Sequence, residues 1–133
     1  MHSEVSNNLQ THITTELGNA ALYRALAEQA PSEQDRQLLL DLAKDTEGHA
    51  ADFQNAYSTI TSRSYTPEIP APNLCANYRD TLKTCVLDAS NDLRVYDEEL
   101  RQLDKNPALK TAFAQAKIDK GVHALRLLNL LNE

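Results

Sequence analysis

The sequence predicts an all-α protein, an antiparallel four-helix bundle with a long crossover between its second and third helices. The composition is typical of a folded helical domain, because hydrophobic residues make up 41% of the 133 residues, charged residues 24%, and glycine occurs only three times. Four segments of roughly 25–30 residues place apolar side chains at alternating steps of three and four, which is the spacing of one helix face. Proline and polar turn residues separate these segments.

The first two segments are expected to form a helical hairpin over about residues 3–61. The turn between them is "APSEQD" at 30–35, in which Ser32 followed by Asp35 has the pattern of a helix N-cap. A turn this short places the two helices side by side and antiparallel. Their stripes read Leu9, Ile13, Glu16, Ala20, Tyr23 and Ala27, then Leu39, Leu42, Thr46, His49, Phe53, Ala56 and Ile60.

A segment with three prolines, "TSRSYTPEIPAPNLC", is the one long linker, and residues 62–73 are assigned to it. The second hairpin is expected over about 74–133. Its turn, "DKNPAL" at 104–109, has Asn106 as a cap and Pro107 at the first helical position. Residues 1–133 form one domain, since the chain is too short for two. The second pair of stripes reads Leu82, Val86, Ala89, Leu93, Tyr96, Leu100 and Leu103, then Leu109, Phe113, Ala116, Lys120, His123, Leu127 and Leu130.

Charge and hydropathy exclude several classes of partner. The net charge of −6 argues against nucleic acid, which needs a basic face. No apolar run approaches the ~20 residues of a membrane span, and the polar start "MHSEVSNNLQ" lacks the apolar region of a signal peptide. Cys75 and Cys85 form no recognised metal or redox spacing. We therefore expect a cytoplasmic protein with no nucleic-acid or membrane partner.

Polar residues interrupt the apolar stripes of three of the four segments. The two halves also repeat, because "DTEGHA" at 45–50 matches "DKGVHA" at 119–124 as D-x-x-x-H-A. A duplicated hairpin places equivalent residues at equivalent heights, so the interrupting side chains are expected to meet near the middle of the bundle. These side chains are Glu16, Thr46, His49, Lys120 and His123.

With these residues the sequence resembles the ferritin-like superfamily, in its rubrerythrin-like branch, over nearly the whole chain. In that family each half supplies a glutamate seven residues before a tyrosine and then D-E-x-x-H-A on the next helix. Four glutamates and two histidines bind two irons inside the bundle. The resemblance implies that Glu16, His49 and His123 are remnants of metal ligands. It also implies supporting hydrogen bonds from Asp45, Asp119, Tyr23 and Tyr96.

Three positions depart from the family pattern, because Thr46, Ala89 and Lys120 stand where the family has glutamates. Glu16 is the one carboxylate left of four, and Lys120 adds a positive charge where a bridging oxygen is expected. A cation a few ångströms from a metal dication costs several kcal/mol, and a buried ammonium needs a charged partner. We therefore expect a Glu16–Lys120 ion pair in the former metal site, with no cofactor and no catalytic residue.

Two metal-binding alternatives stay open. Glu16, His49 and His123 supply one carboxylate and two imidazoles, a set that suits Zn²⁺ or non-haem Fe²⁺ in an oxidoreductase or an iron-handling protein. The pairs Asp45/His49 and Asp119/His123 also share helix faces at i,i+4 and could themselves ligate one ion. Without a metal, the two aspartates are expected to orient the imidazoles through ring N–H hydrogen bonds.

Tyr96 fits a core aromatic residue as well as a ligand-supporting one, because the glutamate of its own half is missing.

Function and assembly follow from the same resemblance. The leading hypothesis is a non-catalytic structural or interaction protein that keeps the bundle and has lost the iron chemistry. Family members self-associate, so a homo-oligomer such as a dimer is expected.

Overall fold

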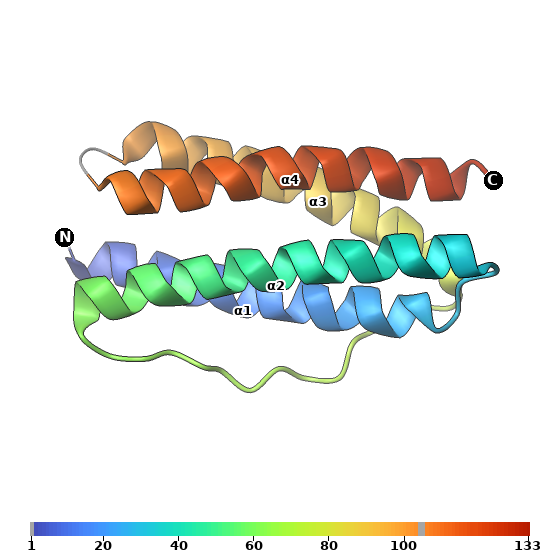
Figure 1. The fold of residues 1–133 in the computed structure, drawn as a ribbon, viewed down its shortest axis with the longest axis horizontal. Helices are drawn as coiled ribbons and strands as arrows, with labels where there is room; N and C mark the ends of the chain where they lie inside the picture. Colours follow the sequence, from blue (N-terminus) through green and yellow to red (C-terminus); the bar gives the residue numbers. More distant parts are fainter. Residues whose placement is uncertain (1, 104–105) are drawn as a thin grey trace.

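The computed structural model describes residues 2–103 and 106–133. Four α-helices follow in order along the chain: α1 (His2–Ala27), α2 (Glu33–Thr61), α3 (Tyr78–Gln102) and α4 (Pro107–Leu131). Helix α1 packs against α2 and α3 against α4, and the two antiparallel hairpins meet mainly through α2 and α4 (Figure 1). The described residues include no strand. The predicted all-α four-helix bundle with a crossover between α2 and α3 is confirmed.

Polar caps start three of the helices. The side chain of Ser32 accepts a hydrogen bond from the Asp35 amide at 3.1 Å, as the sequence predicted. Asn106 likewise accepts from the Leu109 amide at 3.0 Å, with Pro107 as the first residue of α4. The turn expected at 104–109 includes residues 104 and 105, which lie outside the described residues. An unpredicted cap, Asn77, opens α3.

The crossover runs along the outside of the α1–α2 hairpin before it reaches α3 (Figure 1). Helix α3 begins at Tyr78, later than the position 74 expected for the second hairpin. Two residues prevent an earlier start. Cys75 has a left-handed φ of 53°, and Asn77 is extended with φ −162° and ψ 172°. The crossover therefore spans residues 62–77 rather than 62–73.

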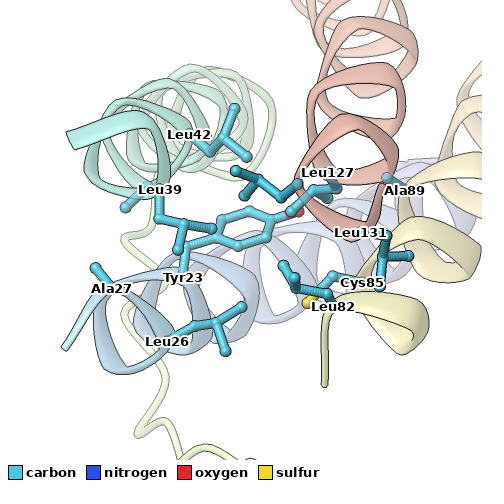
Figure 2. Packing of buried hydrophobic residues seen from close by; sticks show 12 residues of the cluster. Tyr23, Leu26, Ala27, Leu39, Leu42, Leu82, Cys85, Ala89, Leu127 and Leu131 are labelled. Carbon is cyan, nitrogen blue, oxygen red and sulfur yellow. The ribbon is translucent and has the colours of Figure 1, made fainter. Parts of the chain in front are cut away.

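The core consists of two apolar clusters, one at each end of the bundle. At one end, Tyr23 lies among leucines from all four helices (Figure 2). At the other end, Phe53, Tyr96 and Phe113 pack together with ring centroids 4.9–5.7 Å apart. Between the two clusters lie the interrupting polar side chains, each at most 3% exposed: Glu16, Thr46, His49, Lys120 and His123. Glu16, His49 and Lys120 meet in the bundle's middle as expected, and the ring of His123 stacks on that of His49.

None of the helices in residues 2–103 and 106–133 is both long and apolar enough to cross a bilayer.

Candidate functional site

The middle of the bundle holds a buried ion pair between α1 and α4. Nζ of Lys120 lies 2.7 Å from Oε2 of Glu16, and both side chains are 0% exposed. An ammonium withdrawn from water this completely needs a negative partner, because burial of an unpaired charge is very costly. Thr46 and Ala89, both buried, leave room for the long lysine side chain. The hydroxyl of Thr46 donates to the Leu42 carbonyl of its own helix at 2.7 Å.

A second carboxylate reaches the same ammonium from α3. Oδ2 of Asp92 lies 3.5 Å from Nζ of Lys120, and Asn19 donates to the same oxygen at 3.3 Å. Burial raises the pKa of Asp92, although the charge of Lys120 acts in the opposite direction. Glu16, the one carboxylate left at the four family positions, is therefore not the only carboxylate in this layer. Asp92 stands three residues after Ala89, so helical spacing placed it on the same face.

His49 is held by carboxylates at both ring nitrogens. Its Nδ1 lies 2.9 Å from Oε1 of Glu16, and its Nε2 lies 2.6 Å from Oδ2 of Asp119. A neutral imidazole has only one N–H to donate, whereas an imidazolium has two. Burial by itself lowers the pKa of His49, but the hydrogen bond and charge of Glu16, together with the hydrogen bond of Asp119, outweigh it, and the pKa is raised. Carboxylates at both ring nitrogens and a raised pKa therefore favour the imidazolium form of His49 beside Glu16.

His123 has the opposite electrostatic character. Its Nε2 lies 3.1 Å from Oδ2 of Asp45, and its Nδ1 is buried without a hydrogen-bond partner among the described residues. Burial lowers the pKa of His123, and the nearby positive charges of Lys120 and His49 lower it further, although Asp45 opposes them. The ring is therefore neutral at pH 7 and donates from Nε2 to Asp45.

The two aspartates orient the imidazoles, but each one acts on the histidine of the opposite hairpin. Asp119 on α4 bonds to His49 on α2, and Asp45 on α2 bonds to His123 on α4. Side chains at i and i+4 lie one above the other and point the same way, so each short carboxylate reaches the facing helix instead of its own histidine. These reciprocal bonds tie the two hairpins together.

Glu16 is at the centre of this network. Burial raises its pKa, but the hydrogen bond from His49 and the charge of Lys120 outweigh burial, so the pKa lies below its usual range. The ionised carboxylate thus partly neutralises the charges of both Lys120 and His49. Asp92 and Asp119, 17% and 24% exposed, supply the remaining negative charge at the edge of the layer.

The two tyrosines line the network without carrying its charge. Burial and the negative charges of Glu16 and Asp92 raise the pKa of Tyr96, whose buried hydroxyl has no aligned hydrogen-bond partner in the described part of the chain. Burial also raises the pKa of Tyr23. Its ring packs edge-on against His123 with centroids 6.2 Å apart. Both rings are themselves almost fully buried.

A further polar pair links the hairpins outside the predicted site. Nε2 of His12 on α1 lies 2.8 Å from Oε1 of Glu99 on α3, with the His12 ring against Phe53, Tyr96 and Phe113. Helical spacing could have indicated this pair, because His12 stands four residues before Glu16 and therefore on the same face of α1. His12, like His49 and His123, thus bonds to a carboxylate of the other hairpin.

The donor set does not fit a di-iron centre or the alternative site of Glu16, His49 and His123. Both ring nitrogens of His49 and both oxygens of Glu16 already face charged partners. The buried Nδ1 of His123 is the free nitrogen of this set. A metal dication here also meets the charge of Lys120 at close range. No group of three or more His, Cys, Asp or Glu residues within 2–103 and 106–133 is arranged to hold a metal ion.

The chain is similar to a known bacterial protein over most of its length. No family model matches the chain, and no solved structure matches it significantly. A protein of Bacillus subtilis (strain 168) named "Uncharacterized protein YhjR" is 28% identical over 128 residues, which cover 95% of this chain and 86% of the relative. Fold and site together define a four-helix bundle with a buried ion-pair layer, and the alignment with YhjR covers nearly the whole length of this chain.

Proposed function

We propose that this chain is a ferritin-like bundle of the rubrerythrin-like kind in which an ion-pair network stands in place of the di-iron centre. In this proposal it is a non-catalytic structural or interaction protein. The observation that carries the proposal is the Lys120 ammonium, 2.7 Å from Glu16 and fully buried where the family has a metal-bridging carboxylate. Two cationic side chains, Lys120 and His49, take the place of two metal cations.

The orientation of the histidines supports descent from a metal site. A metal-ligating histidine donates its other ring N–H to a carboxylate, which fixes the direction of the ring. Here the Nε2 atoms of His49 and His123 face Asp119 and Asp45, and both Nδ1 atoms are turned into the buried layer. Asp45 and Asp119 thus face the histidines as the supporting carboxylates of such a site do. The four ligand carboxylates of the family are replaced by a layer that contains both positive and negative side chains.

Metal titration of a rebuilt site tests this proposal. In the variant Thr46→Glu/Ala89→Glu/Lys120→Glu the layer regains four glutamates, so added Fe²⁺ is expected to raise its melting temperature. Stabilisation reaches about 2.7 kcal/mol when free metal is about 100-fold above Kd. Wild type is expected to shift little, and Lys120→Glu alone serves as the control that lacks the full ligand set. A wild-type shift equal to that of the triple variant contradicts the proposal.

We also propose that the interaction function is self-association through α4. The large apolar side chains that are exposed in the described structure all lie on α3 or α4. The charged residue next to Ile118, Lys117, already has a partner within the chain, because its Nζ lies 2.8 Å from Oδ1 of Asp97. The exposed apolar residues are Leu87, Ile118, Val122, Leu125 and Leu128.

The exposed apolar residues of α4 run from Ile118 to Leu128, a stretch that rises about 15 Å at 1.5 Å per residue. A specific interface buries roughly 1,200 Å² or more in total, so a second copy must also cover the surface that flanks this stretch. Leu125→Glu is expected to shift the protein to monomer in sedimentation equilibrium. Ala51→Glu on the exposed face of α2 is the control, and equal association of both variants contradicts this interface.

A further inference from the structure

The last residues of the crossover pack against the first turns of α3. Thr81 donates from its hydroxyl to the Leu74 carbonyl, and Sγ of Cys75 lies 3.9 Å from Oγ1 of Thr84. Thr84 directly precedes Cys85 in α3. The path of the crossover thus brings Cys75 against the residue that precedes Cys85 in α3, although the sequence spacing of the two cysteines gives no sign of it.

The two thiols differ sharply in their surroundings. Cys75 is exposed, and its left-handed φ of 53° is unusual for a residue with a side chain. Its amide donates to Oδ1 of Asn73 at 3.0 Å, which holds the local turn. Cys85 is 2% exposed in the apolar cluster of Figure 2. Burial, with the negative charges of Asp88 and Cys75, raises the pKa of the Cys85 thiol to about 12.

A cavity of about 430 Å³ opens beside the exposed thiol, between the crossover, α1 and α3. Thr15 and Asn19 of α1 and Thr84 of α3 contribute polar groups to its wall, and Ile69 and Pro70 of the crossover contribute apolar surface. Cys75 itself lines the cavity. This size and mixed lining suit a small organic molecule with polar and apolar parts.

We propose that Cys75 is a site of thiol–disulfide exchange with a low-molecular-weight disulfide, and that Cys85 resolves the product. In the first step the Cys75 thiolate attacks one sulfur of the small disulfide. A Cys75 mixed disulfide forms, and one small thiol leaves. In the second step the Cys85 thiolate attacks Sγ of Cys75, an internal disulfide forms, and the second small thiol leaves. Two protein thiols are oxidised, and one small disulfide is reduced to two thiols.

The order of the steps follows from exposure. Cys75 meets solvent and the cavity, so it reacts first, whereas Cys85 must leave the apolar cluster and lose its proton before it can attack. The mixed disulfide therefore accumulates before the internal bond closes. The closed bond ties the end of the crossover to α3. Neither the ion-pair layer nor the proposed self-association takes part in this exchange.

Mass spectrometry of the full-length protein with oxidised glutathione as the probe tests the exchange. After quenching with iodoacetamide, wild type is expected to gain one glutathionyl group and then to lose it, ending two hydrogens lighter than the reduced protein. Peptide mapping should link Cys75 to Cys85. Cys85→Ser should stop at the mixed disulfide, and Cys75→Ser should react at least ~10-fold more slowly, because the buried thiol is inert.

A displaced thiol supplies the matched control. In the double variant Cys75→Ser/Ser64→Cys an exposed thiol stands elsewhere on the crossover, and it should keep its glutathionyl group without closing an internal bond. Three results overturn the proposal: no reaction of wild type, a wild-type product that stays at the mixed disulfide, or Cys75→Ser reacting as fast as wild type. Cys75 and Ser64 are both exposed, so the variants Cys75→Ser and Cys75→Ser/Ser64→Cys change no buried side chain. These two variants keep the test valid even where Cys85→Ser folds poorly.

Discussion

Glutamine in place of Glu16 keeps the shape of the side chain and removes its charge. In the folded protein Glu16 faces Nζ of Lys120 at 2.7 Å and accepts from Nδ1 of His49 at 2.9 Å. The variant Glu16→Gln therefore leaves two buried cations with Asp92 and Asp119 as the remaining carboxylates. Asp92 is 3.5 Å from Lys120, too far to replace the lost contact fully.

The size of the effect follows from burial. Removing one partner of a buried ion pair costs about 3–5 kcal/mol, because the other charge stays in the interior without compensation. A loss near 3 kcal/mol lowers the melting temperature of a domain of this size by roughly 10 °C. The pKa of Glu16 lies below its ordinary value, so this contribution is present above the unfolded-state pKa and is lost as pH falls through the folded-state pKa.

Urea unfolding at pH 7 is the assay, with Glu47→Gln as the matched control. Glu47 accepts from Arg24 at 2.6 Å, but both side chains are more than 40% exposed. The same chemical change there is expected to cost about 1 kcal/mol or less, since solvent screens an exposed pair. Equal losses for the two variants refute the account, because they mean that Lys120 finds water or another partner when Glu16 loses its charge.

A double-mutant cycle separates the ion pair from the packing. Lys120→Met removes the ammonium and keeps much of the side-chain volume, so Glu16→Gln/Lys120→Met buries no stranded lysine. Replacing both members of a buried pair by neutral side chains of similar volume is often close to neutral. The double variant is therefore expected to be more stable than Glu16→Gln alone. A purely additive result contradicts direct coupling between the two residues.

Two further changes probe the rest of the network. His49 has a raised pKa, so its stabilising contribution is full below about pH 6.5, the ordinary histidine value, and is lost as pH rises through the folded-state pKa. The stability difference between wild type and His49→Gln in urea should therefore shrink as pH rises, and a constant difference speaks against a charged His49. Asp92→Asn should cost roughly 1 kcal/mol, less than Glu16→Gln, because its contact with Lys120 is longer; a larger loss assigns Asp92 the leading role.

Regular periodicity explains what the sequence could predict. The stripes of the four helices and the caps at Ser32 and Asn106 depend on residues close in the chain, so local rules were sufficient. The contact between Glu16 and Lys120 was also predictable. Antiparallel hairpins with repeated motifs place equivalent positions at one height, and Lys120 is a buried cation in need of a partner.

Features that depend on helix rotation or on an irregular path were missed. Whether an aspartate faces its own histidine or that of the opposite hairpin is set by a fraction of a helical turn, so the exchanged partners of Asp45 and Asp119 do not follow from spacing. Asp92 was passed over because the family comparison directs attention to Ala89. The approach of Cys75 to α3 depends on the crossover, which has no periodic pattern to read.

The most direct test of the central claim is the metal content of the protein as it comes from the cell. Purification without chelator from a medium supplied with iron and zinc, followed by elemental analysis, gives moles of each metal per chain. The account predicts well under one equivalent of either metal, because Lys120 and His49 already supply the positive charge of the layer. Close to two irons per chain, or one zinc per chain that Glu16→Gln removes, contradicts it.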